Sequence, residues 1–234
     1  MRDTFSMRVK PDREARVTRS LLGWGVVAGP FYVVVAVAQG LLRPGFQLAH
    51  DDVSLLSNGG FGWVQIVNFL LTGAMVIACA AGIRRAVGGG GLGTWGSLLL
   101  GLFGLGLIGA GIFVADPIGG FPPGTPPPAK PFTLTLHGTL HLVSAGAGFL
   151  AFAAACFVIG QWFARQRRPR WAWFSRLTAV LFLLGFAGLA SGSTSSVAVL
   201  GFWVVLLLAW GWLAGTAAQL YRRVGEVGEA GDAA

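Results

Sequence analysis

Charged residues are scarce in this sequence, and they are nearly missing from six long apolar stretches. Only 11% of the 234 residues are Asp, Glu, Lys or Arg, whereas 54% are hydrophobic. Soluble domains carry about 25% charged residues. A helix of about 20 apolar residues is long enough to cross the hydrocarbon core of a bilayer. The scarcity of charge therefore argues against a soluble domain and predicts an integral membrane protein.

Cysteine and the common catalytic motifs are scarce as well. The two cysteines, Cys79 and Cys156, fall inside apolar stretches, which argues against a disulfide framework and predicts two small buried side chains. The sequence has no GxxxxGK[ST] phosphate loop, no GxSxG nucleophile motif and no HExxH metalloprotease motif. It also has no acid in the middle of a span, where a proton relay would place one. A transporter is accordingly the least favoured function.

The apolar stretches predict an all-α fold, a polytopic transmembrane helical bundle with six spans. The spans are expected over Leu21–Leu42, Phe61–Ile83, Thr94–Ala115, Leu136–Phe163, Trp171–Ser191 and Val197–Tyr221. Residues 21–221 then form a six-helix transmembrane domain. A basic cytoplasmic tail is expected over residues 1–20 and a flexible cytoplasmic tail over residues 222–234.

Basic residues gather on one side of these spans. Of the 17 Lys and Arg residues, only Arg43 and Lys130 fall on the opposite side. Because Lys and Arg are enriched in cytoplasmic loops, both termini should be cytoplasmic. We expect a multi-pass protein of the cell inner (plasma) membrane. The clustering beside the spans also explains the net charge of +8 without nucleic-acid binding.

The third span is unusually rich in glycine. Small residues let helix backbones approach closely in a membrane. The favoured interpretation is close helix packing; a flexible gating helix, or a surface for a helix-mediated oligomer or a membrane partner, is the alternative. The glycines concerned are Gly101, Gly104, Gly106, Gly109 and Gly111.

Unusual polar residues lie almost entirely on the side opposite the basic clusters. Ionisable groups near a bilayer are costly unless they face a bundle interior or a wet cavity, so we expect one polar pocket at the outer membrane boundary. The candidate catalytic residues are His50, Asp51, Asp116, His137 and His141. The candidate substrate-binding residues are Arg43, Asp52, Ser54, Ser57, Asn58, Gln65, Asn68 and Ser144.

His137 and His141 are one helical turn apart, a spacing at which two imidazoles can bind one metal ion. With Asp116 as a third ligand they could hold zinc. The favoured interpretation is that both histidines form hydrogen bonds to acids of the outer loops. No metal and no other cofactor are expected.

Two blocks of sequence resemble the domain-of-unknown-function 998 family. The first contains RPGF from Arg43, His50, SLLSNG from Ser54 and GWVQIVNF from Gly62; the second contains DPIGGFPPG from Asp116 and HGTLH from His137. The resemblance covers about Leu21 to Tyr221 and implies a prokaryotic protein with about six spans, without implying a reaction. The combination of several spans with an Asp and an HxxxH pair is also similar to that of alkaline ceramidases and adiponectin-type receptors. Those proteins have seven spans and an HxxxH pair on the last one.

The residues leave two main functions open. The pocket could act on or bind a lipid or lipophilic small molecule, with membrane lipids as its surroundings. Alternatively, the protein could be a non-catalytic sensor or a partner subunit of another membrane protein. Whether the protein is an enzyme is left open.

Overall fold

The computed structural model describes residues 11–88, 90–118, 120–126, 134–191 and 195–232, and all regular structure in them is helical. The helices are α1 (Pro11–Leu42), the 3₁₀ helix η1 (Val53–Ser57), α2 (Gly62–Val87), α3 (Gly91–Ile112), α4 (Leu136–Arg165), α5 (Pro169–Ala190) and α6 (Ser196–Asp232). In these described ranges six helices are long and apolar enough to cross a membrane. The all-α, six-span prediction is confirmed, and the chain is a multi-pass membrane protein.

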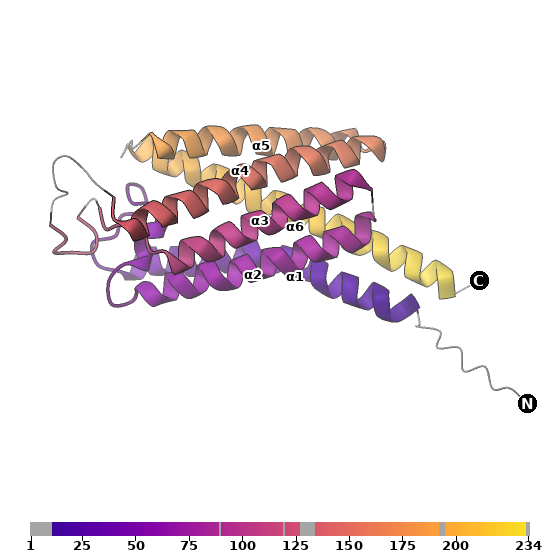
Figure 1. The fold of residues 1–234 in the computed structure, drawn as a ribbon, viewed down its shortest axis with the longest axis horizontal. Coiled ribbons are helices and arrows are strands. Elements are labelled where there is room, and N and C mark those ends of the chain that lie inside the picture. The colour runs from indigo at the N-terminus through magenta and orange to yellow at the C-terminus, as the bar shows by residue number, and fades with distance from the viewer. Residues whose placement is uncertain (1–10, 89, 119, 127–133, 192–194, 233–234) are drawn as a thin grey trace, which may run out of the picture.

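The six long helices run lengthwise in one bundle (Figure 1), and their contacts form a closed ring. Each helix packs against the helices before and after it in the sequence, and α1 also packs against α6. Two glycines of α1 allow this last contact. A Cβ atom on Gly29 would lie 2.6 Å from Trp210 Cβ, and one on Gly25 would lie 2.9 Å from Ala217 Cβ. Only residues without a side chain fit α1 this closely against α6.

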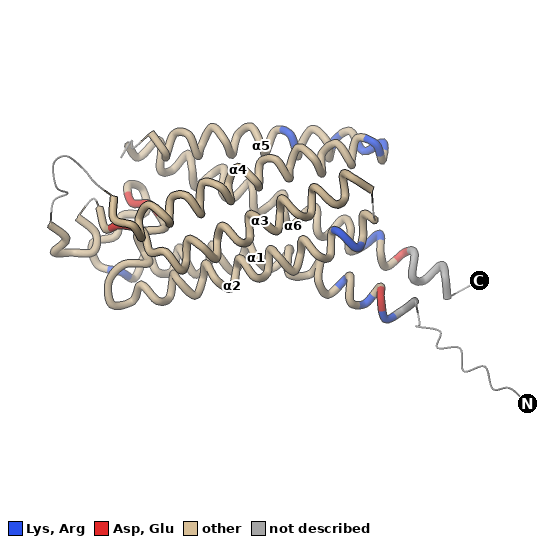
Figure 2. The backbone as a smooth tube through the Cα atoms, in the orientation of Figure 1, with Lys and Arg blue, Asp and Glu red and all other residues tan. Residues whose placement is uncertain are grey.

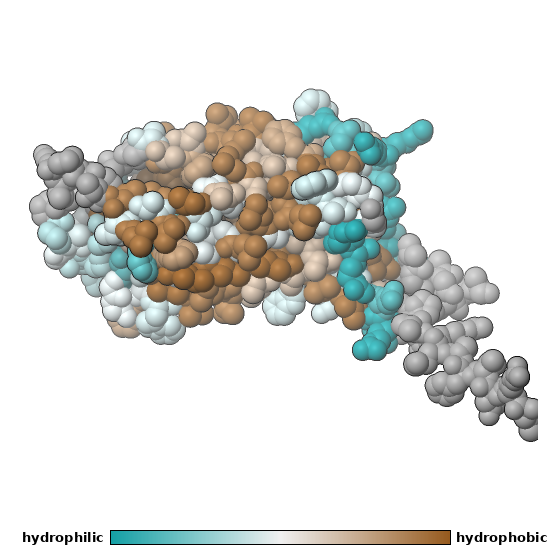
Figure 3. Space-filling model, in the orientation of Figure 1, coloured by the Kyte–Doolittle hydropathy of each residue, from teal (hydrophilic) through white to brown (hydrophobic). Residues whose placement is uncertain are grey.

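The two ends of the bundle differ in charge. Both chain ends lie at one end, where most of the arginines gather (Figure 2). At the other end the described charged residues are Arg43, Asp51, Asp52 and Asp116. An apolar surface lies between the two ends (Figure 3). This distribution matches that of a bundle whose middle lies in hydrocarbon.

The outermost helices are longer than their apolar stretches. α1 begins at Pro11 and α6 continues to Asp232, so helical structure extends into the segments that the sequence analysis assigned to the two tails. In the added turns of α1, Ala, Arg and Glu favour a helix outside the hydrocarbon too. The other span boundaries agree with the prediction to within a few residues.

Glycine brings α3 close to both neighbouring helices. A Cβ on Gly104 would lie 2.7 Å from the carbonyl oxygen of Gly73 on α2, and one on Gly106 would lie 2.7 Å from Gly148 Cα on α4. These glycines therefore serve close packing inside the chain, as the favoured interpretation predicted. Gly101 faces open space.

Aromatic side chains fill the centre of the ring. Trp212 of α6 is fully buried against Phe152 of α4, and its Nε1 donates a 2.8 Å hydrogen bond to Ser175 Oγ of α5. Cys79 and Cys156 are free and buried, as predicted. The packing is less complete beyond Phe182, the last buried residue of α5, and a cavity begins there.

Candidate functional site

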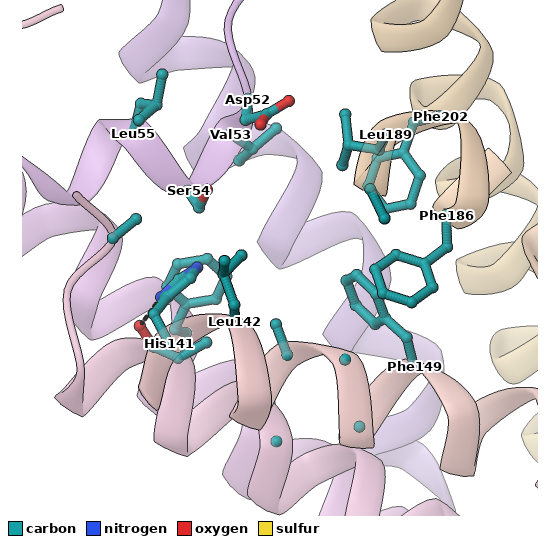
Figure 4. A pocket seen from close by; sticks show the side chains of 18 of the residues that line it. Asp52, Val53, Ser54, Leu55, His141, Leu142, Phe149, Phe186, Leu189 and Phe202 are labelled. Atoms are coloured by element: carbon teal, nitrogen blue, oxygen red, sulfur yellow. Dashed lines mark hydrogen bonds between the residues drawn. The ribbon is translucent and has the colours of Figure 1, made fainter. Parts of the chain in front are cut away.

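A cavity of about 470 Å³ lies between η1 and the adjoining parts of α4, α5 and α6 (Figure 4). Small-molecule sites in proteins have volumes of about 300–1,000 Å³. The cavity lies at the end of the bundle opposite the chain termini, because η1 follows α1 and precedes α2 there. This is the end at which the sequence analysis placed the polar pocket.

Most of the cavity wall is apolar. Phe149 of α4, Phe186 and Leu189 of α5 and Phe202 of α6 line one side, as Figure 4 shows. Phe149 also stacks edge-on against Phe182, with ring centroids 5.2 Å apart, which fixes the inner boundary of the cavity. The sequence analysis missed these residues, because an aromatic residue in an apolar span has the same pattern whether it faces core, lipid or cavity.

The opposite side of the cavity carries the polar residues among apolar ones such as Val53 and Leu142. Asp52 and Ser54 come from the start of η1, and His141 comes from the second turn of α4 (Figure 4). Asp51 and Asp116 line the cavity as well. Five of the predicted site residues therefore share one cavity, although they come from the loop after α1, the loop after α3 and the start of α4.

His141 is buried, with 3% of its surface exposed, and its hydrogen bonds define its tautomer. Its Nδ1 atom lies 2.8 Å from the carbonyl oxygen of Phe113 and 3.0 Å from that of Ala110. Since carbonyl oxygens only accept, Nδ1 must carry the hydrogen. In the neutral ring Nε2 is then an acceptor, and no described residue forms a hydrogen bond with it.

Asp116 holds the beginning of α4. Its two carboxylate oxygens accept hydrogen bonds from Thr135, one from Oγ1 at 2.5 Å and one from the backbone nitrogen at 2.8 Å. A Cβ atom on Gly138 would overlap the same carboxylate. A negative charge beside a helix N-terminus is favourable because backbone N–H groups and the helix dipole point toward it. Asp116 is therefore already engaged in the fold.

The two adjacent acids before η1 have different surroundings. Asp51 is buried, and its Oδ2 accepts a 2.7 Å hydrogen bond from the backbone nitrogen of Gln47. Asp52 is half-buried and occupies the N-cap position of η1 without a side-chain capping bond. No described residue forms a hydrogen bond or an ion pair with its carboxylate. Burial raises the pKa of Asp52, and the neighbouring Asp51 raises it further.

Three predicted binding residues build the loop instead of lining the cavity. Arg43 donates 2.5 Å hydrogen bonds to the carbonyl oxygens of Leu56 and Asn58, and its guanidinium carbon lies 4.8 Å from the ring centroid of Phe121. Ser57 donates to the Ser54 carbonyl, and Asn58 donates to that of Leu55. These bonds fold the segment around η1.

Three others lie between helices. Gln65 and Asn68 of α2 are buried, and Gln65 Oε1 accepts from Gln39 of α1 at 2.8 Å. Asn68 donates to the Tyr32 carbonyl at 3.2 Å. Ser144 of α4 packs at Gly109 of α3. These polar groups connect helices inside the bundle, and they do not line the cavity.

The remaining two histidines lie away from the cavity. His50 is exposed, and its Nε2 lies 3.1 Å from Ser196 Oγ at the start of α6. His137 is exposed, with its ring 5.9 Å from that of Phe113. Among the described residues no three His, Cys, Asp or Glu side chains are grouped as metal ligands. The structure thus does not assemble His137, His141 and Asp116 into a zinc site.

Comparison with known proteins gives one family. The sequence model of the family described as "Protein of unknown function (DUF998)" matches residues 26–219, a range that includes η1, the whole of α2 to α5, more than half of α1 and of α6, and every cavity residue named above. No curated protein and no solved structure matches the chain. The matched range covers most of the sequence, and the chain belongs to the DUF998 family.

Proposed function

We propose that the protein binds one lipophilic molecule in the cavity between η1, α4, α5 and α6. The observation that carries this proposal is the division of the cavity into two ends. Asp52, Ser54 and His141 lie at one end, and aromatic side chains such as Phe186 and Phe202 lie at the other. An amphiphile matches such a division, because its polar part keeps polar contacts while its apolar part is removed from water.

The bonds of Asp116 and of His141 Nδ1 give these two groups a structural role. A general acid or base must reach a proton of the bound substrate. Both carboxylate oxygens of Asp116 are already bonded to Thr135, and His141 Nδ1 is bonded to two carbonyls. These groups support the shape of the cavity. We therefore propose that the cavity binds a ligand, and we assign no reaction to it.

The proposed location of the cavity is the outer boundary of the cell inner membrane. The cavity end carries Arg43 as its single described Lys or Arg, whereas the end with the chain termini carries the other described arginines. The excess of arginine supports cytoplasmic termini. The ligand would then come from the outer leaflet or from the space outside it.

A cavity-filling variant tests the proposal. The full chain in a neutral steroid-based detergent is titrated with monolaurin, a neutral single-chain amphiphile, and the complex is followed by native mass spectrometry. Gly146 lines the cavity on α4, and a Cβ there would lie 3.6 Å from Phe186. We expect saturable binding of one probe by the wild type and at least about a tenfold loss of affinity in Gly146→Leu.

The matched control is Gly101→Leu on α3, which introduces the same side chain where nothing lies within 4 Å of the new Cβ. Gly101→Leu should bind as the wild type does. Ala145→Leu is a second cavity-filling variant, in case Gly146→Leu does not fold. Equal, unsaturable uptake by all these proteins would overturn the proposal.

A further inference from the structure

The polar end of the cavity offers hydrogen-bond acceptors and negative charge. The acids and the histidine that line it are Asp51, Asp52, Asp116 and His141, and among the described residues no Lys or Arg lines the cavity. The Nδ1 hydrogen of His141 is taken by the carbonyls of α3, so the ring has only the Nε2 lone pair to offer when it is neutral. Ser54 adds a hydroxyl, which can both donate and accept.

We propose, on the basis of the binding function proposed above, that the ligand carries a cationic head group that lies at Asp52. The ligand class is a single-chain lipophilic amine or quaternary ammonium compound. Its apolar chain would extend toward Phe149, Phe186 and Phe202.

Asp52 is the acid that remains free to meet a cation. Asp116 is bonded to Thr135 through both oxygens, and Asp51 is bonded to the backbone of Gln47. The Asp52 carboxylate is half-buried and has no hydrogen-bonding or ionic partner among the described residues. A partly buried carboxylate without a partner is costly, and a cation placed beside it offsets that cost.

The cavity is unfavourable for an anionic head group. A phosphate or carboxylate would face three aspartates at the polar end, and no Lys or Arg of the described ranges lines the cavity beside them. Arg43 belongs to the same loop, but it donates to the carbonyls of Leu56 and Asn58 and does not line the cavity.

Three probes with one chain length separate head-group charge from chain binding. Dodecyltrimethylammonium, dodecanol and dodecanoate are titrated against the full chain in the same neutral steroid-based detergent, with native mass spectrometry as the readout. We expect the ammonium compound to bind at least about tenfold more tightly than dodecanoate, with dodecanol between them. This comparison needs no variant of the protein.

The variant Asp52→Asn then tests whether Asp52 is the carboxylate that contacts the cationic head group. The amide is close in shape and removes the charge, and Asp52 makes no capping bond that would be lost. The affinity for dodecyltrimethylammonium should fall about tenfold, which corresponds to about 1.4 kcal/mol, while the affinity for dodecanol stays the same. Glu14→Gln removes a carboxylate from the opposite end of the bundle and should leave both affinities unchanged.

The outcomes distinguish this inference from the binding function itself. If dodecanoate binds as tightly as the ammonium compound, and Gly146→Leu abolishes the binding of both, the cavity binds amphiphiles. The proposal of a cationic head group is then wrong. An equal loss of dodecanol and ammonium binding in Asp52→Asn would also overturn the role of its charge. If none of the three probes binds saturably, both proposals fail.

Discussion

His141 of α4 closes the end of α3: its Nδ1 atom donates to the carbonyl oxygen of Phe113 at 2.8 Å, with the Ala110 carbonyl 3.0 Å away. The last carbonyls of a helix have no partner within the helix. In a membrane protein, carbonyls left without any partner are costly. One imidazole thus joins two helices at the place where the cavity wall begins.

Replacing this imidazole should weaken the bundle. His141→Ala leaves buried carbonyl groups without their donor, a loss of about 1–3 kcal/mol in the free energy of unfolding. The thermal unfolding midpoint of the detergent-solubilised protein should fall accordingly. His137→Ala is the matched control, because that exposed side chain lies one turn earlier on the same helix. Equal midpoints for the two variants would contradict the structural role of His141.

A methyl group on Gly104 should be far more damaging than one on Gly101. The Cβ of Gly104→Ala would lie 2.7 Å from the carbonyl oxygen of Gly73, whereas that of Gly101→Ala meets nothing within 4 Å. Forcing α2 and α3 apart costs about 1–3 kcal/mol, so Gly104→Ala should unfold at a lower temperature. Gly101→Ala should be unchanged or slightly more stable, because alanine favours a helix. Indistinguishable unfolding curves would show that α2 and α3 do not approach this closely.

The stability of the protein should depend on pH through Asp52. Burial and the nearby Asp51 raise the pKa of Asp52, so ionisation of this carboxyl opposes the folded loop. Its stabilising contribution is fully present below the ordinary aspartate pKa and is lost as pH rises through the raised value. Asp52→Asn should therefore gain more stability over the wild type near neutral pH than at about pH 4. Thermal unfolding at both values measures this difference, and a gain that does not change with pH would contradict the prediction.

Cysteine labelling tests the orientation in the membrane. Gln47 is exposed in the loop before η1, and Gln166 is exposed in the turn between α4 and α5. In a background with Cys79 and Cys156 replaced by alanine, a membrane-impermeant maleimide added to spheroplasts should label Gln47→Cys but not Gln166→Cys. Disrupting the membrane should allow both to react. Labelling of Gln166→Cys alone in intact spheroplasts would reverse the topology.

Hydropathy was sufficient to predict the six helices, because a span needs little more than length and low charge. The approximate place of the pocket followed from the cost of ionisable groups at a membrane boundary. This argument placed Asp116 and His141 together, and both line the cavity. The same argument could not show which of the two histidines, His141 or His137, lines the cavity. Only the position of the end of α3 decides that one imidazole meets carbonyl groups while the other stays exposed.

Other residues could not be assigned from the sequence because their partners are backbone atoms. Arg43 was predicted to bind substrate, but its guanidinium folds the loop by meeting the carbonyls of Leu56 and Asn58. A sequence pattern does not show which backbone carbonyl oxygens a folded loop leaves free to accept a hydrogen bond from a side chain. For the same reason the apolar half of the cavity, with Phe186 and Phe202, becomes visible only when α5 and α6 are placed.

The ring of helices also has a consequence for biosynthesis. Each helix from α2 to α5 packs on the helix inserted immediately before it, so these contacts can form in the order of translation. The contact between α1 and α6 joins the first helix to the last, and the α1 surface around Gly25 and Gly29 must wait for Ala217 and Trp210. Until α6 is inserted, that glycine surface faces lipid or an insertion factor. A ribosome that stalls after α5 would leave an open ring, in which the glycine surface of α1 has no partner helix.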